Sequence, residues 1–597
     1  MADPLPSVKT TESSAPARPA ANATYQPWGE TLSRKRIAAV IGAVMLGMLL
    51  SAIDQTVVGT AMPRIIADLN GLQHYAWVAT AYLLASTASM PIWGKLSDAF
   101  GRKRFFIAGM VVFMVGSALC GQAGNMTELI AFRALQGLGA GAMMPITQAI
   151  IGDIFPPAQR ARWTGVLMSV FAVATIVGPL LGGWITDNAS WRWVFYVNIP
   201  IGIAAITAAA IALPGHVTLR KHRIDYWGAT LLVGATVPLL LGFSWAGSEY
   251  AWGSWQVVSL FAFSAAVWVA FVLHELRATE PVINPRLFEN RIFSVSALAS
   301  MLQSATMFGA IMFLPLFVQG VQGKSATSSG LILMPLMMGA MVTSIGAGQI
   351  LAKTGRYKAL VIAGFVAVAI GAWLLSRMGV DTSSTTLAIN MVIMGFGLGI
   401  AMSAFTVIVQ NQYPSQRLGE VTAGLQFFRS IGGTIGMAVF GTILNNQFAA
   451  AMKEMLPAPL QRLTRSPDGA AIDNPQVLLS TEAAAKLREA FTRFGEDGDR
   501  LFAQFMDAVR QSLAAAISEL FLLATVVGVV GLVVVLFLRE DPLRRTHMTF
   551  AEAELLAAEA EAGATGGETP FGAAAAGGQA PTTTDQPDPD PDRDPEG

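Results

Sequence analysis

Long apolar stretches separated by short polar segments occupy the chain from residue 37 to residue 537. Fourteen of them have about the ~20 residues that a helix needs to cross the ~30 Å hydrocarbon core of a bilayer. They are residues 37–60, 76–93, 104–122, 128–150, 163–186, 193–213, 227–245, 256–274, 292–317, 328–351, 359–378, 387–410, 420–445 and 513–537. The pattern predicts an all-α polytopic membrane protein with fourteen transmembrane helices.

Clusters of lysine and arginine occur in alternate loops between these stretches. They lie at residues 34–36, 95–104, 160–162, 220–223, 353–358 and 544–545. Because basic loops stay on the cytoplasmic side, both termini are expected in the cytoplasm, which agrees with an even number of spans. Over the whole chain Lys+Arg and Asp+Glu balance at 39 each, so net charge indicates neither a nucleic acid nor any other partner.

Two halves of the chain repeat each other. Residues 94–103 recur as 348–356, residues 157–160 recur as 414–417, and the glycine series 137–141 recurs as 395–399, at offsets of 254 to 258 residues. The offsets pair helices on the same side of the membrane. We therefore expect two six-helix bundles in parallel repeat, helices 1–6 and 9–14, with helices 7 and 8 inserted between them. Repeats of this kind build transporters whose substrate site lies between the halves.

The resulting organisation has seven parts. They are a disordered N-terminus (1–33), a first six-helix bundle (34–215), the inserted helices 7 and 8 (216–280), helices 9 to 13 (281–445), an extracytoplasmic loop (446–510), helix 14 (511–540) and a disordered tail (541–597) rich in Ala, Gly, Pro, Thr and Asp. Within residues 446–510, apolar residues at helical spacing around 487–494 and 501–509 predict short amphipathic helices, with a solvated hairpin as the alternative.

Asp54 is a carboxylate inside the first apolar stretch, where an ionisable residue indicates a functional site if it has a partner. At 1.5 Å per residue it lies ~12 Å from the outer end of its helix, and Arg133 lies ~8 Å from the outer end of helix 4. These depths match, so we expect the two to pair. Arg133 nearby favours the charged form of Asp54 and apolar surroundings favour the neutral form, as a proton switch requires. A static ion pair that only packs two helices is the alternative.

The turn that follows helix 2 contains two glycines, an acidic residue and basic residues. It comprises Gly94, Asp98, Gly101, Arg102 and Lys103. The glycines permit a tight turn, the basic residues hold it in the cytoplasm, and Asp98 can pair with them or with a helix N-terminus. The turn serves either as a cytoplasmic gate or only to set topology. In the second copy Ala352 replaces Asp98, so any gate is asymmetric.

Helix 5 contains the residues Gly178, Pro179, Gly182 and Gly183. Glycines four residues apart let a helix approach a neighbour closely, and proline bends it. Helix packing alone accounts for such a pattern, and a role in transport is the alternative.

Few acidic residues fall within the C-terminal helices, which favours neutral, zwitterionic or singly charged amphipathic substrates. Amides, methionines and aromatic residues are the candidates for a substrate cavity, since methionine adapts to varied apolar shapes. They are Gln136, Gln303, Met307, Phe308, Met334, Gln426 and Phe427.

The sequence contains no complete nucleotide-binding or metal-binding motif. Gly323, Lys324 and Ser325 look like the end of a phosphate loop, but Val318 stands where that motif needs glycine. Cys120 is the only cysteine, so neither an internal disulfide nor a cysteine-based metal site is possible. We expect no metal and no cofactor.

Five segments resemble motifs of the fourteen-helix drug:proton antiporter branch of the major facilitator superfamily, in the same order. They are residues 54–64, 94–104, 133–139, 178–183 and 191–202. The resemblance covers about residues 35 to 545. It implies the major facilitator fold and a bacterial multidrug efflux permease that works by alternating access. It also implies that Asp54 and Arg133 couple transport to protons, that Asp98 docks a gate against the other half, and that the helix 5 motif sets the export direction.

The expected partners are the bilayer of the bacterial cytoplasmic membrane, small amphipathic substrates and protons, whose gradient drives export. We expect a monomer that binds no nucleic acid, with residues 446–510 available to an envelope partner. Two other functions stay open: export of an endogenous lipid or metabolite, and a membrane sensor or scaffold that transports nothing.

Overall fold

The computed structural model describes residues 28–69, 75–215, 224–247, 249–323, 333–456, 491 and 498–546. In this part of the chain the regular elements are helices, and thirteen of them are long and apolar enough to cross a membrane. A further helix, α3 (Tyr75–Phe100), has 26 residues and is therefore also of spanning length. The predicted all-α fold with fourteen membrane helices is confirmed.

The helices follow the predicted order. The first bundle consists of α2 (Arg34–Leu69), α3, α4 (Arg102–Gln122), α5 (Met126–Ile154), α6 (Pro157–Asn188) and the consecutive helices α7 (Trp193–Tyr196) and α8 (Asn198–Ala212). The inserted pair is α9 (Tyr226–Trp245) and α10 (Trp255–Glu275). The second bundle consists of α11 (Arg291–Leu316), α13 (Met334–Thr354), α14 (Lys358–Leu375), α15 (Ser384–Gln410), α16 (Leu418–Met455) and α18 (Gly498–Leu536). Short elements are α1 (Trp28–Thr31), η2 (Pro285–Glu289), η3 (Phe317–Val321) and η4 (Ser415–Arg417).

The sequence repeat is also a repeat of helix contacts. On α5, Gly137 lies against the backbone of α3, and Gly139 lies against α4. On α15, their counterparts Gly395 and Gly397 lie against α13 and α14 in the same way. A side chain at any of these glycines would collide with backbone atoms of the neighbouring helix. The two bundles therefore share one packing scheme, as a parallel repeat requires.

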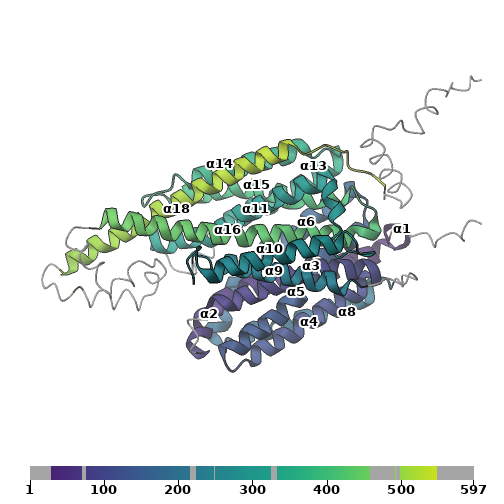
Figure 1. Cartoon of the computed structure of the whole chain (residues 1–597), viewed down its shortest axis with the longest axis horizontal. Coiled ribbons are helices and arrows are strands. Elements are labelled where there is room, and N and C mark those ends of the chain that lie inside the picture. Colours follow the sequence, from purple (N-terminus) through teal and green to yellow (C-terminus); the bar gives the residue numbers. More distant parts are fainter. Residues whose placement is uncertain are drawn as a thin grey trace, which may run out of the picture. The chain divides into compact units, whose positions relative to one another are not determined.

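The two bundles meet along two pairs of helices. α6 packs against α13, and α3 packs against α16, while α9 packs against α3, α16 and α10. Figure 1 shows α2, α4, α5 and α8 of the first bundle on one side of α16, and α14, α15 and α18 on the other. The seam between α3 and α16 therefore lies under the inserted helices.

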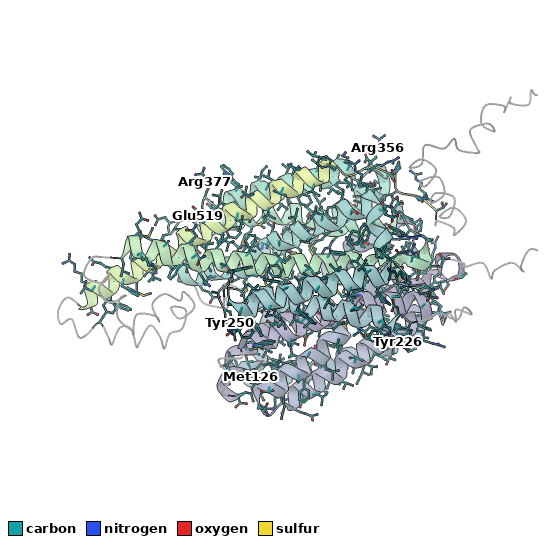
Figure 2. All side chains as sticks on the ribbon, in the orientation of Figure 1. Met126, Tyr226, Tyr250, Arg356, Arg377 and Glu519 are labelled. Atoms are coloured by element: carbon teal, nitrogen blue, oxygen red, sulfur yellow. The ribbon has the colours of Figure 1, made fainter. Side chains whose placement is uncertain are left out.

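The helix ends that carry the basic clusters gather at one end of the bundle, which we call the basic end. There the Arg36 Nε donates to the carbonyl of Ala212, at 3.2 Å, across two helix termini. Figure 2 shows Tyr226 and Arg356 toward this end and Met126 toward the opposite end. Alternate helix connections thus lie at opposite ends, as the distribution of Lys and Arg predicts.

The ordered chain begins before residue 34 and continues past residue 540, which differs from the predicted disordered ends. Trp28 in α1 is buried against α5 because its indole fills the apolar cluster there. At the other end, the amide of Leu543 donates to the Gly355 carbonyl, and the amide of Arg544 donates to Asn411 Oδ1. The remaining parts, residues 1–27 and 547–597, lie outside the described residues.

Helices α16 and α18 extend into the stretch that was expected to be a loop. α16 continues to Met455 and α18 starts at Gly498, and the two pack against each other. Phe448 and Met452 of α16 and Phe505 of α18 are buried in one apolar cluster, which stabilises both extensions. The apolar residues at 501–509 therefore belong to the start of α18, not to a separate amphipathic helix. The expected helix around 487–494 lies, apart from residue 491, outside the described residues.

Candidate functional site

Asp54 and Arg133 form an ion pair in the interior of the first bundle. Arg133 Nη1 donates to Asp54 Oδ2 at 2.7 Å. Asp54 on α2 is 0% exposed and Arg133 on α5 is 3% exposed. Both charges are removed from water, so the pair is tolerated only if further hydrogen bonds satisfy both groups.

Two amides complete the hydrogen bonding of the Asp54 carboxylate. Gln136 Nε2 and Asn198 Nδ2 both donate to Asp54 Oδ1, at 2.8 and 2.9 Å. Gln136 lies one turn after Arg133 on α5, and Asn198 is the first residue of α8. Arg133 and the two amides therefore give each oxygen of the Asp54 carboxylate at least one hydrogen-bond donor.

Arg133 has partners besides Asp54. Nη1 donates to Gln136 Oε1 at 2.8 Å, Nε donates to the Val78 carbonyl at 3.4 Å, and the guanidinium lies 4.2 Å from the centre of the Tyr82 ring. Cation–π contacts and these acceptors stabilise a cation independently of Asp54. Arg133 therefore has neighbours besides Asp54 that accept its hydrogen bonds and interact favourably with its charge.

Three members of this network were not predicted as partners of Asp54. Gln136 was expected to line a substrate cavity, Asn198 was noted only within a motif, and Tyr82 was not singled out. Each polar group lies in an otherwise apolar helix, which is the signal that could have identified it. Gln136 is fully buried, and its amide donates to Asp54.

At the basic end, Asp98 joins the two bundles. Its Oδ1 accepts from the amide of Gly419 at 2.9 Å and its Oδ2 accepts from the amide of Glu420 at 2.6 Å. Both amides belong to the first turn of α16, where N–H groups lack partners in the helix and favour an anion. Asp98 on α3 therefore caps a helix of the other half.

Arg102 strengthens the same contact. Its Nη1 donates to Asp98, its Nε donates to Asp153 Oδ2 at 3.0 Å, and its Nη2 donates to the Ser415 carbonyl at 3.2 Å. One buried arginine thus binds two carboxylates of the first bundle and a carbonyl of the second. Asp153 and Ser415 were not predicted, because only the fold brings them to this turn.

Close backbone approach accompanies these bonds. A side chain on Gly94 would come within 2.5 Å of the Gly419 carbonyl, and one on Gly419 would come within 2.6 Å of the Gly94 carbonyl. Gly101 has a φ of 103°, which a residue with a side chain rarely adopts, so it makes the turn between α3 and α4 possible. Lys103 does not reach the second bundle, because its Nζ donates to the Ala210 carbonyl of α8.

Further hydrogen bonds at the basic end involve residues of both bundles. Arg160 Nη1 donates to Gln410 Oε1 at 3.3 Å, and Gln410 Nε2 donates to the hydroxyl of Thr422 at 2.8 Å and to the Gln148 carbonyl at 3.4 Å. Lys95 lies 3.8 Å from the carboxylate of Glu420. The basic end is therefore sealed in this structure by side chains from both halves.

The glycines of α6 differ in what surrounds them. Gly178 lies against Thr56, and a side chain on Gly182 would come within 2.8 Å of the Val57 carbonyl, both on α2. A side chain on Gly183 would meet nothing within 4 Å. Helix packing thus accounts for two of these glycines, and it places them on the helix that carries Asp54. The side chain of Pro179 lies outside the described residues.

We expect Gly182→Ala to destabilise the protein and Gly183→Ala to be tolerated. The added methyl at 182 must displace the α2 backbone, and overpacking of this kind costs about 1–3 kcal/mol. At 183 the methyl enters open space and improves helix propensity by up to ~1 kcal/mol. The thermal unfolding midpoints of the two purified variants in detergent measure the difference. Equal midpoints would contradict the close contact between α2 and α6.

The predicted cavity residues do not all lie together. Phe427 is buried against Trp268 of the inserted α10, with ring centres 6.1 Å apart, and Met307 packs against the apolar cluster that holds the extended helix ends. Gln303 Nε2 donates to the Leu398 carbonyl of α15, and Gln426 Nε2 approaches Met144 Sδ across the seam. The other two, Phe308 and Met334, are half-buried, and Phe308 lies beside Gly433.

The described residues contain no group of three or more His, Cys, Asp and Glu side chains placed to hold a metal ion.

Comparison with known proteins identifies the family. Residues 44–437 match the profile of the Major Facilitator Superfamily. The multidrug transporter protein MdtP of Bacillus subtilis is 39% identical over 511 residues, which are 84% of this chain and 92% of that protein. An uncharacterized MFS-type transporter of Mycobacterium tuberculosis, Rv1877, is 37% identical over 526 residues, covering 87% of this chain and 72% of its own length.

Solved structures agree at the level of the fold. The proton:xylose symporter XylE matches with a TM-score of 0.53 at 13% identity, over 88% of this chain and the whole of its own. The human organic anion transporter MFSD10 matches with a TM-score of 0.54 at 14% identity, over 82% of this chain and 99% of its own. With the family profile covering most of the chain and MdtP aligned over nearly its full length, the protein belongs to the major facilitator superfamily and is an integral, multi-pass membrane transporter.

Proposed function

We propose that this protein is a proton-coupled antiporter that exports amphipathic compounds across a bacterial cytoplasmic membrane. The observation that carries the proposal is the buried carboxylate of Asp54, held by Arg133 and two amides inside the first bundle. A buried ion pair contributes little to stability, because removing both charges from water costs free energy. It is suited to a site that gains and loses a proton. The printed names of the relatives, a multidrug transporter and a multidrug resistance protein, support drugs as substrates.

The basic residues support an orientation with the basic end in the cytoplasm, where α1 and the segment that follows α18 also lie. The contacts of Asp98, Arg102 and Gln410 then form a closed cytoplasmic gate, and this conformation is the one that releases substrate to the outside.

The transport cycle follows from the two sets of contacts. When the gate opens to the cytoplasm, Asp54 is deprotonated and paired with Arg133, and substrate binds between the halves. Closing the gate and opening the opposite side releases the substrate, after which a proton from outside neutralises Asp54. Arg133 then relies on Gln136, Val78 and Tyr82, and the neutral network favours the return. Once the gate is open to the cytoplasm, Asp54 releases its proton there and the next substrate binds. Each proton that moves inward supplies ~2.3 kcal/mol per 100 mV of membrane potential.

Purified protein in liposomes tests the function directly. Rhodamine 123, an amphipathic cation, is followed by fluorescence after a pH gradient is imposed with acid on the side opposite the basic end. We expect transport against the concentration gradient that stops when a protonophore collapses the pH gradient. Transport that is unaffected by the protonophore, or no transport of this and related amphipathic dyes, would contradict the proposal.

A further inference from the structure

Arg429 is a buried arginine whose charge no carboxylate compensates. It lies on α16 and is 7% exposed. Its Nη2 donates weakly to the Met402 carbonyl of α15, at 3.5 Å. Its Nε and Nη1 have no hydrogen-bond partner among the residues that the structure describes, and no ion pair joins it to any of them.

This environment differs from that of the other buried arginines described above. Arg133 lies against Asp54, and Arg102 lies against Asp98 and Asp153. An unpaired buried charge costs several kcal/mol, and an unsatisfied polar group in a native structure calls for an explanation. A buried cation with free N–H groups is suited to bind an anion.

Other polar atoms without partners lie around Arg429. Gln426 is one turn earlier on the same face of α16, and its Oε1 has no partner in the described chain. Gln303 donates to the Leu398 carbonyl, one turn of α15 before the carbonyl that Arg429 contacts, and its Oε1 is also unpartnered. The unpartnered hydroxyl of Ser304 lies 3.1 Å from the position of a Cβ on Gly433, one turn after Arg429. Two helices, α11 and α16, thus present unsatisfied polar groups next to α15.

This region lies at the seam between the halves and near mid-membrane. Gln426 Nε2 reaches Met144 of α5 at 2.7 Å, and Ser430 Oγ lies 3.9 Å from Met90 of α3. Arg429 is eleven residues into α16 from the basic end, or ~16 Å along the helix axis at 1.5 Å per residue. In transporters built from two repeats, substrate binds at this depth and at this interface.

We propose that Arg429, with Gln426 and Gln303, binds the acidic group of an anionic amphipathic substrate, such as a carboxylate or a sulfonate. The free N–H groups of the guanidinium are the charge-assisted donors, and the unpartnered hydroxyl of Ser304 can donate a further hydrogen bond. Gln303 and Gln426 donate to the anion once their Nε2 groups leave the Leu398 carbonyl and Met144. The apolar part of the substrate lies against Phe308 and Met402, which are half-buried beside this region. This inference deepens the proposed function, on which it rests, by naming anionic amphipaths as a substrate class.

Two dyes of similar skeleton and opposite charge test the inference. Fluorescein carries a carboxylate, while rhodamine 123 shares its fused rings and is a cation. Binding of each dye to purified wild-type protein, Arg429→Gln and Arg429→Lys is measured by fluorescence anisotropy at constant ionic strength. We expect Arg429→Gln to weaken fluorescein binding about tenfold or more, since a hydrogen bond to a charged group is lost. Arg429→Lys keeps the charge and is expected to retain most of the affinity, and rhodamine 123 is expected to bind all three proteins equally or to bind Arg429→Gln more tightly.

The variant is expected to fold, because removing an uncompensated buried charge does not leave a partner unpaired. An unfolding midpoint of ligand-free Arg429→Gln at or above that of the wild type is the corresponding readout. Equal fluorescein affinity in wild type and Arg429→Gln, equal losses for both dyes, or no fluorescein binding by the wild type would overturn the inference. These outcomes are separate from the fate of the proposed function, which the gradient-driven movement of rhodamine 123 by the wild type decides.

Discussion

Replacing Asp54 by Asn is expected to abolish transport driven by the pH gradient. Asn preserves the size of the side chain and most of its hydrogen bonds, but it neither carries charge nor accepts a proton at neutral pH. We expect gradient-driven movement of rhodamine 123 in liposomes to fall at least ~100-fold, to the level of empty vesicles. Exchange of labelled for unlabelled dye without a gradient is expected to persist, because it requires alternating access but no net proton movement.

Asp68→Asn is the matched control on the same helix. Asp68 Oδ2 accepts from Trp191 Nε1 at 2.8 Å and from Arg192 Nη1 at 3.1 Å, away from the Asp54 network. These bonds lower the pKa of Asp68, so it stays charged throughout the working pH range and is not suited to carry protons. Full gradient-driven transport by Asp54→Asn, or an equal loss in Asp68→Asn, would contradict the role of Asp54.

Replacing Asp98 by Asn is expected to open the basic end. The Asn side chain keeps one acceptor oxygen, but its NH2 group points a donor toward the N–H groups of α16. The substitution also removes the negative charge that pairs with Arg102. A hydrogen bond to a charged group contributes about 1.5–3 kcal/mol, so the open population should rise about tenfold or more. Export is expected to fall in parallel, because the substrate path no longer closes on the cytoplasmic side.

Labelling of an introduced cysteine measures this opening. Thr422 is buried in the closed seam, where its hydroxyl accepts from Gln410, so Thr422→Cys should react slowly with a membrane-impermeant maleimide. The native Cys120 is fully buried and provides the background rate in protein without the added cysteine. We expect Asp98→Asn to speed labelling at 422, and Asp381→Asn, an exposed position in the loop between α14 and α15, to leave it unchanged. Equal labelling in all three backgrounds would show that Asp98 does not hold the gate.

Much of the fold was predictable because long apolar runs and alternating basic loops determine where helices cross the membrane. The glycine series of α5 and α15 also showed the repeat before any coordinates, since both copies need small residues at the same helix contacts. The helical spacing at 501–509 predicted a helix there, but as a separate amphipathic helix and not as the start of α18, and the extension of α16 to Met455 was not predicted. Both extensions depend on apolar contacts between the two helices, such as those of Phe505, which periodicity alone does not reveal.

The contacts of the site were predictable where the depth of a residue in the membrane, or its position at a helix end, determines its partner. Asp54 and Arg133 lie at similar depths in helices of the same bundle, and their contact is present in the structure. Asn198 and Tyr82 were not assigned to Asp54, because their contacts depend on how each helix is rotated about its axis. For the same reason, Met307 and Phe427 could not be told apart from cavity residues, since periodicity alone does not separate a face toward a neighbouring helix from a face toward substrate.

Proton release on substrate binding is the most direct test of the central claim that substrate and proton exchange through Asp54. Purified protein in weakly buffered detergent solution is mixed with rhodamine 123, and a pH indicator reports the protons released. If substrate binding and protonation of Asp54 exclude each other, the wild type releases up to about one proton per chain and Asp54→Asn releases none while still binding the dye. The account would be contradicted if the wild type bound the dye but released no protons at any pH. It would also be contradicted if Asp54→Asn released as many protons as the wild type.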